Sequence, residues 1–407
     1  MVDKILSIFG SGNSSATNYP SDDQQQPFDR LRRSPTVELI EDSPKYRSFR
    51  GRVALKRLSL DEDCTKAWSY HECGPREVRC PMVFLPPVTG TADVFFQQVE
   101  YLAERGYRVI SAEYPSYFTM EEFCEGLLRL LRYFKVKQVH LFGASLGGFL
   151  AQKFAQYNPS VIASLFLCNA FGDTSRFKFV NTVPLVWLAP APLLRSYFIT
   201  KEVPEDADEQ IRAAAHFMSS KVATLSQADL LARLTLNLTS DYVRPERLQS
   251  LAITVMDVFD HCAHSSSTRL ELYKLYPSAR RAHLKQGGNY PYLSRPEEVN
   301  MHLLVHLRQF NHTERAACVH FMDVKEGAAD LDTSSVEYHS NSLESSVEVA
   351  RVAEEQIRPP PPTAKAIAER IEEVAVESAA ANSDMTPKLV KEAAVPSSAN
   401  AQVDHLV

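Results

Sequence analysis

The chain has 407 residues, 44% of them apolar, so it is long enough to bury the core of one large globular domain. Its formal charge of −6 and the lack of a dense Lys/Arg block argue against a nucleic-acid surface or a polybasic membrane anchor. We therefore expect small molecules or proteins as ligands, no cofactor or metal, and at most peripheral membrane association.

Targeting and redox signals are sparse. The first ten residues are too short for a secretory signal, and the apolar run from Val183 to Leu194 contains three prolines and is shorter than the roughly 20 residues needed to cross a bilayer. Seven cysteines, an odd number, lie without CxxC spacing, which indicates reduced thiols in the cytosol.

The two ends of the chain differ from its middle. Residues 1–45 are rich in Ser, Asp, Gln and Pro and predict a disordered arm. Residues 326–407 predict an acidic low-complexity tail, with 13 acidic and 6 basic side chains after residue 330 and one possible short helix at 363–380. The remaining segment, 46–325, is the expected folded domain.

Strand and helix patterns alternate along the first half of this domain. A hairpin is expected at 52–60 and 67–71, and a buried strand at 82–85. Later strands are expected at 107–115, 138–145 and 161–171, and helices at 91–106, 121–136 and 146–157. This repeating βα order is typical of a mostly parallel sheet with helices on both faces.

The regular pattern stops at about residue 172 and resumes at about 250, which predicts a helical lid inserted into the fold. A strand at 251–260, a helix at 267–276, a strand at 280–286 and a last helix at 295–310 then complete the order. The sequence therefore predicts an α/β-hydrolase fold with a lid insertion.

A nucleophile elbow lies between the strand at 138–145 and the helix that follows it. Gly143-Ala144-Ser145-Leu146-Gly147 matches G-x-S-x-G in the required strand–turn–helix context. A sharp turn there exposes the serine hydroxyl, and the helix N-terminus favours negative charge developing beside it. A packed glycine-rich turn without chemistry is the alternative.

The oxyanion hole of this fold takes one backbone N–H from the residue after the nucleophile and one from the loop after the 82–85 strand. Leu146 and Val88 occupy these positions. Two prolines at 86 and 87 remove donors from the loop, so a rigid turn that only packs is equally compatible with the sequence.

The other two triad positions fall in the loops after the last two strands. Asp260 fits the acid, with Asp257 as the second choice, although a turn or cap carboxylate is an equal alternative for Asp260. The loop expected to carry the histidine reads Gly287-Gly288-Asn289, and an amide cannot accept the serine proton. Asp260 and Asn289 therefore indicate a vestigial triad around Ser145.

Another histidine could still act as the base. His283 lies six residues before Asn289, about 20 Å along an extended strand, which is too far. His261 and His264 follow the candidate acid in a loop that can approach the elbow, so a rearranged pair is an alternative. His140 and His302 are expected to be packing or exposed residues.

Long segments of the chain resemble the maspardin family of α/β-hydrolase-like proteins, among them CPMVFLPPVTGTADVFFQQ, VHLFGASLGGFLAQKFAQY and LYKLYPSARRAHLKQGGNYPYLSRPEEVN. The resemblance covers about 49–310 and includes the Asn at position 289. It implies a non-catalytic protein that binds a T-cell coreceptor cytoplasmic tail and an aldehyde dehydrogenase. It further implies a cytosolic location with endosomal and trans-Golgi association.

Two functions follow from these observations. The first is a protein-binding adaptor or negative regulator in signalling or vesicle trafficking, indicated by Asn289 and the two prolines. The second is a serine hydrolase acting on an ester or thioester through Ser145, indicated by the intact elbow. The missing base favours the adaptor.

Overall fold

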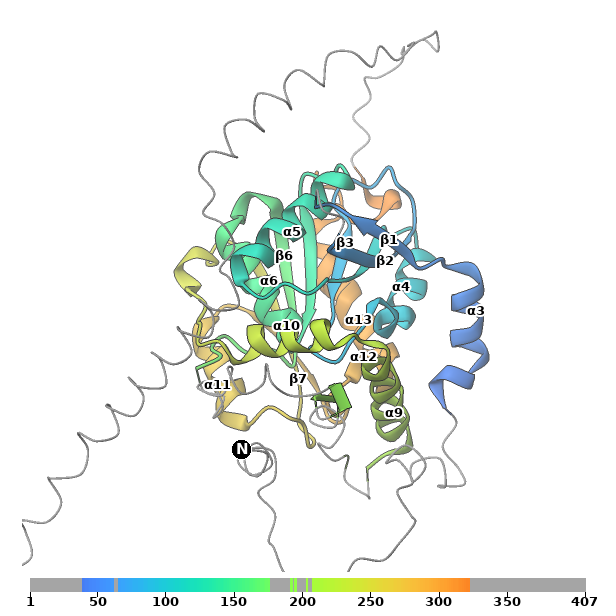
Figure 1. The fold of residues 1–407 in the computed structure, drawn as a ribbon. Coiled ribbons are helices and arrows are strands. Elements are labelled where there is room, and N and C mark those ends of the chain that lie inside the picture. The colour runs from blue at the N-terminus through green and yellow to red at the C-terminus, as the bar shows by residue number, and fades with distance from the viewer. Residues whose placement is uncertain are drawn as a thin grey trace, which may run out of the picture. The chain divides into compact units, whose positions relative to one another are not determined.

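The computed structural model describes residues 39–61, 65–175 and 207–322, together with 191, 192, 194, 195 and 203. An eight-stranded sheet in the order β1-β2-β4-β3-β5-β6-β7-β8 runs through this part of the chain. The pairs from β4 through β8 are parallel, and β1 and β2 are antiparallel additions at one edge. The predicted α/β-hydrolase fold is confirmed (Figure 1).

The strands follow the apolar runs of the sequence. Their bounds are β1 Lys56–Ser59, β2 Ala67–Cys73, β3 Met82–Leu85, β4 Val109–Glu113, β5 Val139–Ala144, β6 Ile162–Cys168, β7 Ala252–Val258 and β8 Arg280–Leu284. All residues of β3, β5 and β6 are buried, as expected for strands covered on both faces. The expected hairpin is also present, because β1 pairs antiparallel with β2.

Two apolar clusters fill the two faces of the sheet. Because successive side chains of a strand point to opposite faces, Leu141 of β5 packs in one cluster and Phe142 in the other. Helices α5 (Met120–Tyr133) and α6 (Leu146–Tyr157) cover the first face. Helices α4 (Phe96–Ala103) and α13 (Pro296–Leu307) cover the second (Figure 1).

Two helices of the expected lid insertion are described: α9, Glu209–Thr224, and α10, Gln227–Leu238. They lie at the carboxyl ends of the parallel strands in Figure 1, and a capping box at Ser226 and Asp229 starts α10. Most of 176–206 lies outside the described residues. Helix α11, Ser266–Leu275, follows β7 as expected.

The sequence patterns missed two short helices. The domain starts earlier than the expected boundary at 46, with a 3₁₀ turn at Ile40–Asp42 and helix α3 at Pro44–Arg52, which begins at a Ser43 cap. Helix α12, Pro291–Ser294, directly follows the loop that carries Asn289. Residues 1–38, 323–407 and the possible helix at 363–380 lie outside the described residues.

Candidate active site

The nucleophile elbow has the strained geometry that its sequence requires. Ser145 follows β5 with φ 49° and ψ −116°, a left-handed φ that a non-glycine residue rarely adopts. A Cβ at Gly143 would lie 2.4 Å from the Gly147 carbonyl oxygen, and one at Gly147 would lie 2.3 Å from the Leu85 oxygen. The tight turn therefore depends on both glycines, and it presents Ser145 at the start of α6.

An imidazole stands next to the nucleophile. Nε2 of His264 lies 3.2 Å from Oγ of Ser145, within hydrogen-bond distance. His264 belongs to the loop between β7 and α11, and its ring packs 5.5 Å from the ring of Phe171. Of the two alternative histidines considered from the sequence, His264 is brought to the elbow, whereas His261 is exposed.

Asp260 and Asn289 occupy the expected loops, but their hydrogen bonds join one loop to the other. The Asp260 carboxylate accepts hydrogen bonds from the backbone N–H groups of Gly287 (2.9 Å) and Gly288 (3.0 Å). Oδ1 of Asn289 accepts one from the N–H of Ala263 at 2.6 Å. We call these reciprocal contacts the loop latch. The latch holds Ala263, the residue directly before His264.

A third polar side chain supports the latch from β6. Asn169 follows that strand with φ 44°, and its Nδ2 donates to the Gly288 carbonyl at 3.1 Å. Gly288 has φ 61°, and a Cβ there would meet the side chain of Ile211 on lid helix α9 at 2.9 Å. The Gly-Gly-Asn loop is therefore fixed between the sheet and the lid.

The candidate oxyanion loop lies against the elbow. β3 pairs in parallel with β5, so its following loop reaches α6, where the Leu85 and Pro86 carbonyl oxygens leave no room for a Cβ at Gly147. Among the described residues, neither the Val88 nor the Leu146 N–H donates a hydrogen bond. Both remain candidates for stabilising an oxyanion at Ser145.

Arg233 of α10, which was not expected from the sequence, holds this loop. Its side chain is 1% exposed, and Nη1 donates to the carbonyl oxygens of Gly90 (2.5 Å) and Val88 (3.2 Å). The guanidinium also lies over the Tyr114 ring and 3.5 Å from Glu113. In the sequence, this arginine stands among the leucines of QADLLARLTLNL. A charged residue on an apolar helix face needs partners when it is buried, so its position could have indicated a role in holding neighbouring groups.

Burial raises the pKa of two acidic side chains near the site. The pKa of Glu113 is raised by desolvation, although the Arg233 charge acts in the opposite direction. Desolvation also raises the pKa of Asp257, which is 4% exposed. Asp257, the second choice for the acid, is thus a buried residue of β7.

The other histidines considered from the sequence have structural contacts. His140 is fully buried and lies 2.7 Å from Oγ of Ser164 and 2.8 Å from the Arg315 carbonyl oxygen. His283 lies on β8 at 2.9 Å from the Tyr273 hydroxyl. Within the described ranges, no group of three or more His, Cys, Asp or Glu side chains is placed to hold a metal ion.

Comparison with known proteins places the fold and the family. The model of the α/β hydrolase fold family matches residues 81–209. Maspardin from Danio rerio is 49% identical over 283 residues, which is 69% of this chain and 91% of that protein. Maspardin from Homo sapiens is 49% identical over 280 residues, 68% of this chain and 91% of that protein.

Solved structures share the fold at low sequence identity. An enol-lactonase from Burkholderia xenovorans aligns with a TM-score of 0.54 and 16% identity, covering 62% of this chain and all of that one. A carboxylesterase from Nitrososphaera gargenis aligns at 0.52 and 17% identity, covering 62% and 98%. At this identity the likeness establishes the fold alone.

Proposed function

Because this chain belongs to the maspardin family of α/β-hydrolase-fold proteins, we propose that it retains a serine acyl-transfer site in which His264, rather than a residue at position 289, is the base. This proposal rests on the distance of 3.2 Å between His264 Nε2 and Ser145 Oγ. A base within hydrogen-bond distance of the nucleophile is the geometric requirement for activating a serine.

The reaction follows from the positions of these groups. A neutral His264 ring with its proton on Nδ1 accepts the Ser145 hydroxyl proton at Nε2 while Oγ attacks the carbonyl carbon of an ester or thioester. The oxyanion forms beside the N–H groups of Leu146 and Val88. The imidazolium returns its proton to the leaving alcohol or thiol, and water releases the acyl group in a second cycle with His264 again as base.

The acid of a complete triad is not supplied by Asp260. Every hydrogen bond of its carboxylate in the described structure goes to the Gly287 and Gly288 N–H groups. Asp260 therefore serves the loop latch, and the proposed hydrolase relies on the pair of Ser145 and His264.

A second candidate function is binding without catalysis, favoured by the use of Asp260 and Asn289 as a loop latch. In this proposal the chain is an adaptor or negative regulator in the cytosol and on endosomal and trans-Golgi membranes. Its partners would be a receptor cytoplasmic tail and an aldehyde dehydrogenase, by resemblance to the maspardin family. The described part of the chain has no helix long and apolar enough to cross a membrane.

Labelling with a fluorophosphonate probe separates the two functions, because such probes react with activated serines whatever the natural substrate. Purified wild-type protein and the Ser145→Ala variant would be compared by in-gel fluorescence. We expect labelling of the wild type that Ser145→Ala abolishes. If the wild-type protein stays unlabelled, the hydrolase function is excluded and the binding function is retained as the proposal.

A further inference from the structure

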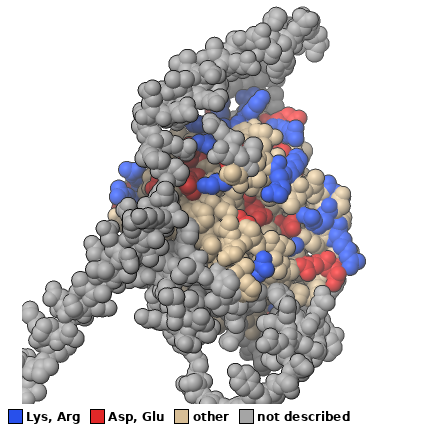
Figure 2. All heavy atoms as spheres, viewed as in Figure 1, with Lys and Arg blue, Asp and Glu red and all other residues tan. Residues whose placement is uncertain are grey.

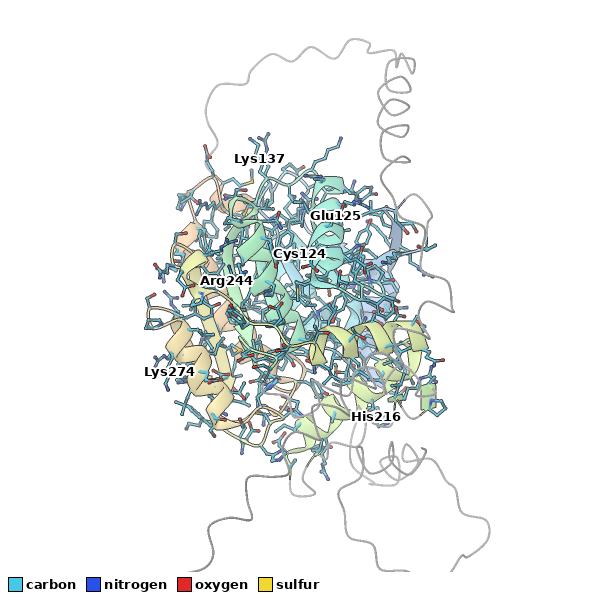
Figure 3. All side chains as sticks on the ribbon, turned by 60° about the vertical axis from the view of Figure 1, so that its left-hand side comes forward. Cys124, Glu125, Lys137, His216, Arg244 and Lys274 are labelled. Atoms are coloured by element: carbon cyan, nitrogen blue, oxygen red, sulfur yellow. The ribbon has the colours of Figure 1, made fainter. Side chains whose placement is uncertain are left out.

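A large cleft lies at the end of the sheet opposite the nucleophile. It has a volume of about 1490 Å³, and its lining includes residues one or two positions before parallel strands: Cys80 before β3, Arg108 before β4 and Lys137 before β5. Ser145 follows β5, whose six residues span about 20 Å. Figure 3 shows Lys137 at the end of the domain away from His216 of lid helix α9.

The lining of this cleft is basic. Six of its residues are basic and three are acidic: Lys56, Arg76, Arg79, Arg108, Lys135 and Lys137 against Glu72, Glu77 and Glu314. The Glu72 carboxylate, 7% exposed, is within 4 Å of three of the cations, Arg108 (2.9 Å), Lys56 (3.5 Å) and Arg76 (3.6 Å). Cations therefore exceed carboxylates even around the buried acid.

Arg108 forms the buried part of the basic lining. Its side chain is 6% exposed, and its Nη atoms bind the Val78 carbonyl oxygen (3.0 Å) and Glu72 (2.9 Å). Its Nε is buried and has no hydrogen-bond partner among the described residues. An arginine N–H without a partner at such depth is costly unless an acceptor binds there.

Three further cations line the cleft at its exposed rim. Arg79, Lys135 and Lys137 are exposed, and none forms an ion pair with any residue that the structure describes. Lys135 follows α5 with a left-handed φ of 52°, which fixes the backbone direction there. Figure 2 shows Lys and Arg side chains, with some Asp and Glu among them, along the upper and right-hand edges of the domain, and Figure 3 places Lys137 at the upper end.

Aromatic side chains give the cleft an apolar wall. Tyr70 and Phe134 pack edge to face at 5.1 Å, and Tyr133, 51% exposed, stands beside them. A simple inorganic anion would not use this wall, and the volume exceeds that of an ordinary small-molecule pocket, about 300–1,000 Å³. The lining fits an extended segment that alternates acidic and apolar side chains.

We propose that this basic cleft is a docking site for a glutamate-rich peptide segment of a partner protein. Acidic side chains of the segment pair with Arg79, Lys135 and Lys137, and an apolar side chain contacts Tyr133. Such contacts are largely electrostatic, so affinity falls as salt is added. The site is separate from Ser145 and does not depend on whether that serine is catalytic.

The test uses the full chain and a fluorescein-labelled twelve-residue peptide of repeated Glu-Glu-Leu, followed by fluorescence anisotropy at low and moderate salt. We expect saturable binding that moderate salt weakens and that Lys135→Glu/Lys137→Glu weakens about tenfold or more. The matched control is Lys274→Glu/Lys285→Glu, which reverses two exposed charges elsewhere and should bind as wild type does.

Three results would overturn the proposal. They are no binding by the wild type, equal loss in the cleft and control variants, and tighter binding of a single-stranded oligonucleotide of the same charge. The last outcome would assign the cleft to nucleic acid. Circular dichroism of each variant shows that the fold is retained, and Arg79→Gln supplies an independent exposed position should the double variant misfold.

Discussion

The two ends of the parallel sheet are built differently. At the carboxyl end, polar groups are engaged in holding loops: Asp260 and Asn289 close the loop latch, and Arg233 fixes the carbonyls of the oxyanion loop. At the amino end, Arg79, Lys135 and Lys137 carry charge that no described residue neutralises. The first arrangement suits a preorganised reaction site, and the second suits a surface that acquires its counter-charges from a partner.

The largest effect is expected at Arg233. Arg233→Met keeps most of the side-chain volume but leaves Glu113 without its ion-pair partner and two loop carbonyls without their buried donor. Breaking a buried pair in this way typically costs about 3–5 kcal/mol, so the urea midpoint should fall sharply. Arg57→Met, at an exposed position on β1, is the control and should unfold as wild type does. Equal midpoints for wild type and Arg233→Met would show that Arg233 does not hold the loop.

Asn289→His distinguishes a latch from a damaged triad. If the site is a triad that lacks only the histidine at position 289, Asn289→His should restore the base and increase fluorophosphonate labelling. The hydrogen bond from Ala263 predicts the opposite: labelling should fall about tenfold, equivalent to about 1.4 kcal/mol, because the loop carrying His264 is released. Asn289→Asp keeps the acceptor oxygen and should retain most of the labelling. A gain in Asn289→His would contradict the latch.

Acid should destabilise the centre of the sheet through its buried histidines. Burial lowers the pKa of His306 to about 3 and that of His140 to about 4, and both rings contact Ser164. The unfolded chain therefore binds protons below about pH 6.5 that the folded chain does not, and stability is lost as pH falls from there toward 4.

His306→Gln isolates this contribution. The free energy of unfolding of the wild type should fall more steeply than that of the variant between pH 6 and 5, by about 1 kcal/mol. Urea unfolding at the two pH values measures it, and because both proteins share all carboxylates, those contributions largely cancel. Parallel pH profiles for wild type and variant would show that this imidazole titrates normally.

The smallest effect is expected when charges in the basic cleft are reversed and the reactivity of Ser145 is measured. This experiment tests whether the two ends of the parallel sheet act independently. Lys135→Glu/Lys137→Glu should leave fluorophosphonate labelling at the wild-type rate, because β5 separates these lysines from Ser145 by about 20 Å, beyond the Debye length at physiological salt. A changed labelling rate in a correctly folded variant would show that the cleft and the serine are coupled.

The sequence predicted what depends on local pattern and chain order. Apolar periodicity placed the strands, the glycine spacing placed Ser145, and the order of loops placed Asp260 and Asn289. The partners of these side chains could not be predicted, because the latch joins residues 26 and 27 positions apart through backbone groups. The approach of His264 depends on that same tertiary contact, which has no signature in the local sequence.

The role of His264 as the base for Ser145 can be measured by the rate of fluorophosphonate labelling in His264→Gln, with His261→Gln as the matched control in the same loop. We expect His264→Gln to slow labelling by about 100-fold or more, whereas His261→Gln labels at the wild-type rate. Labelling of His264→Gln at the wild-type rate would show that the imidazole beside the serine takes no part in activating it.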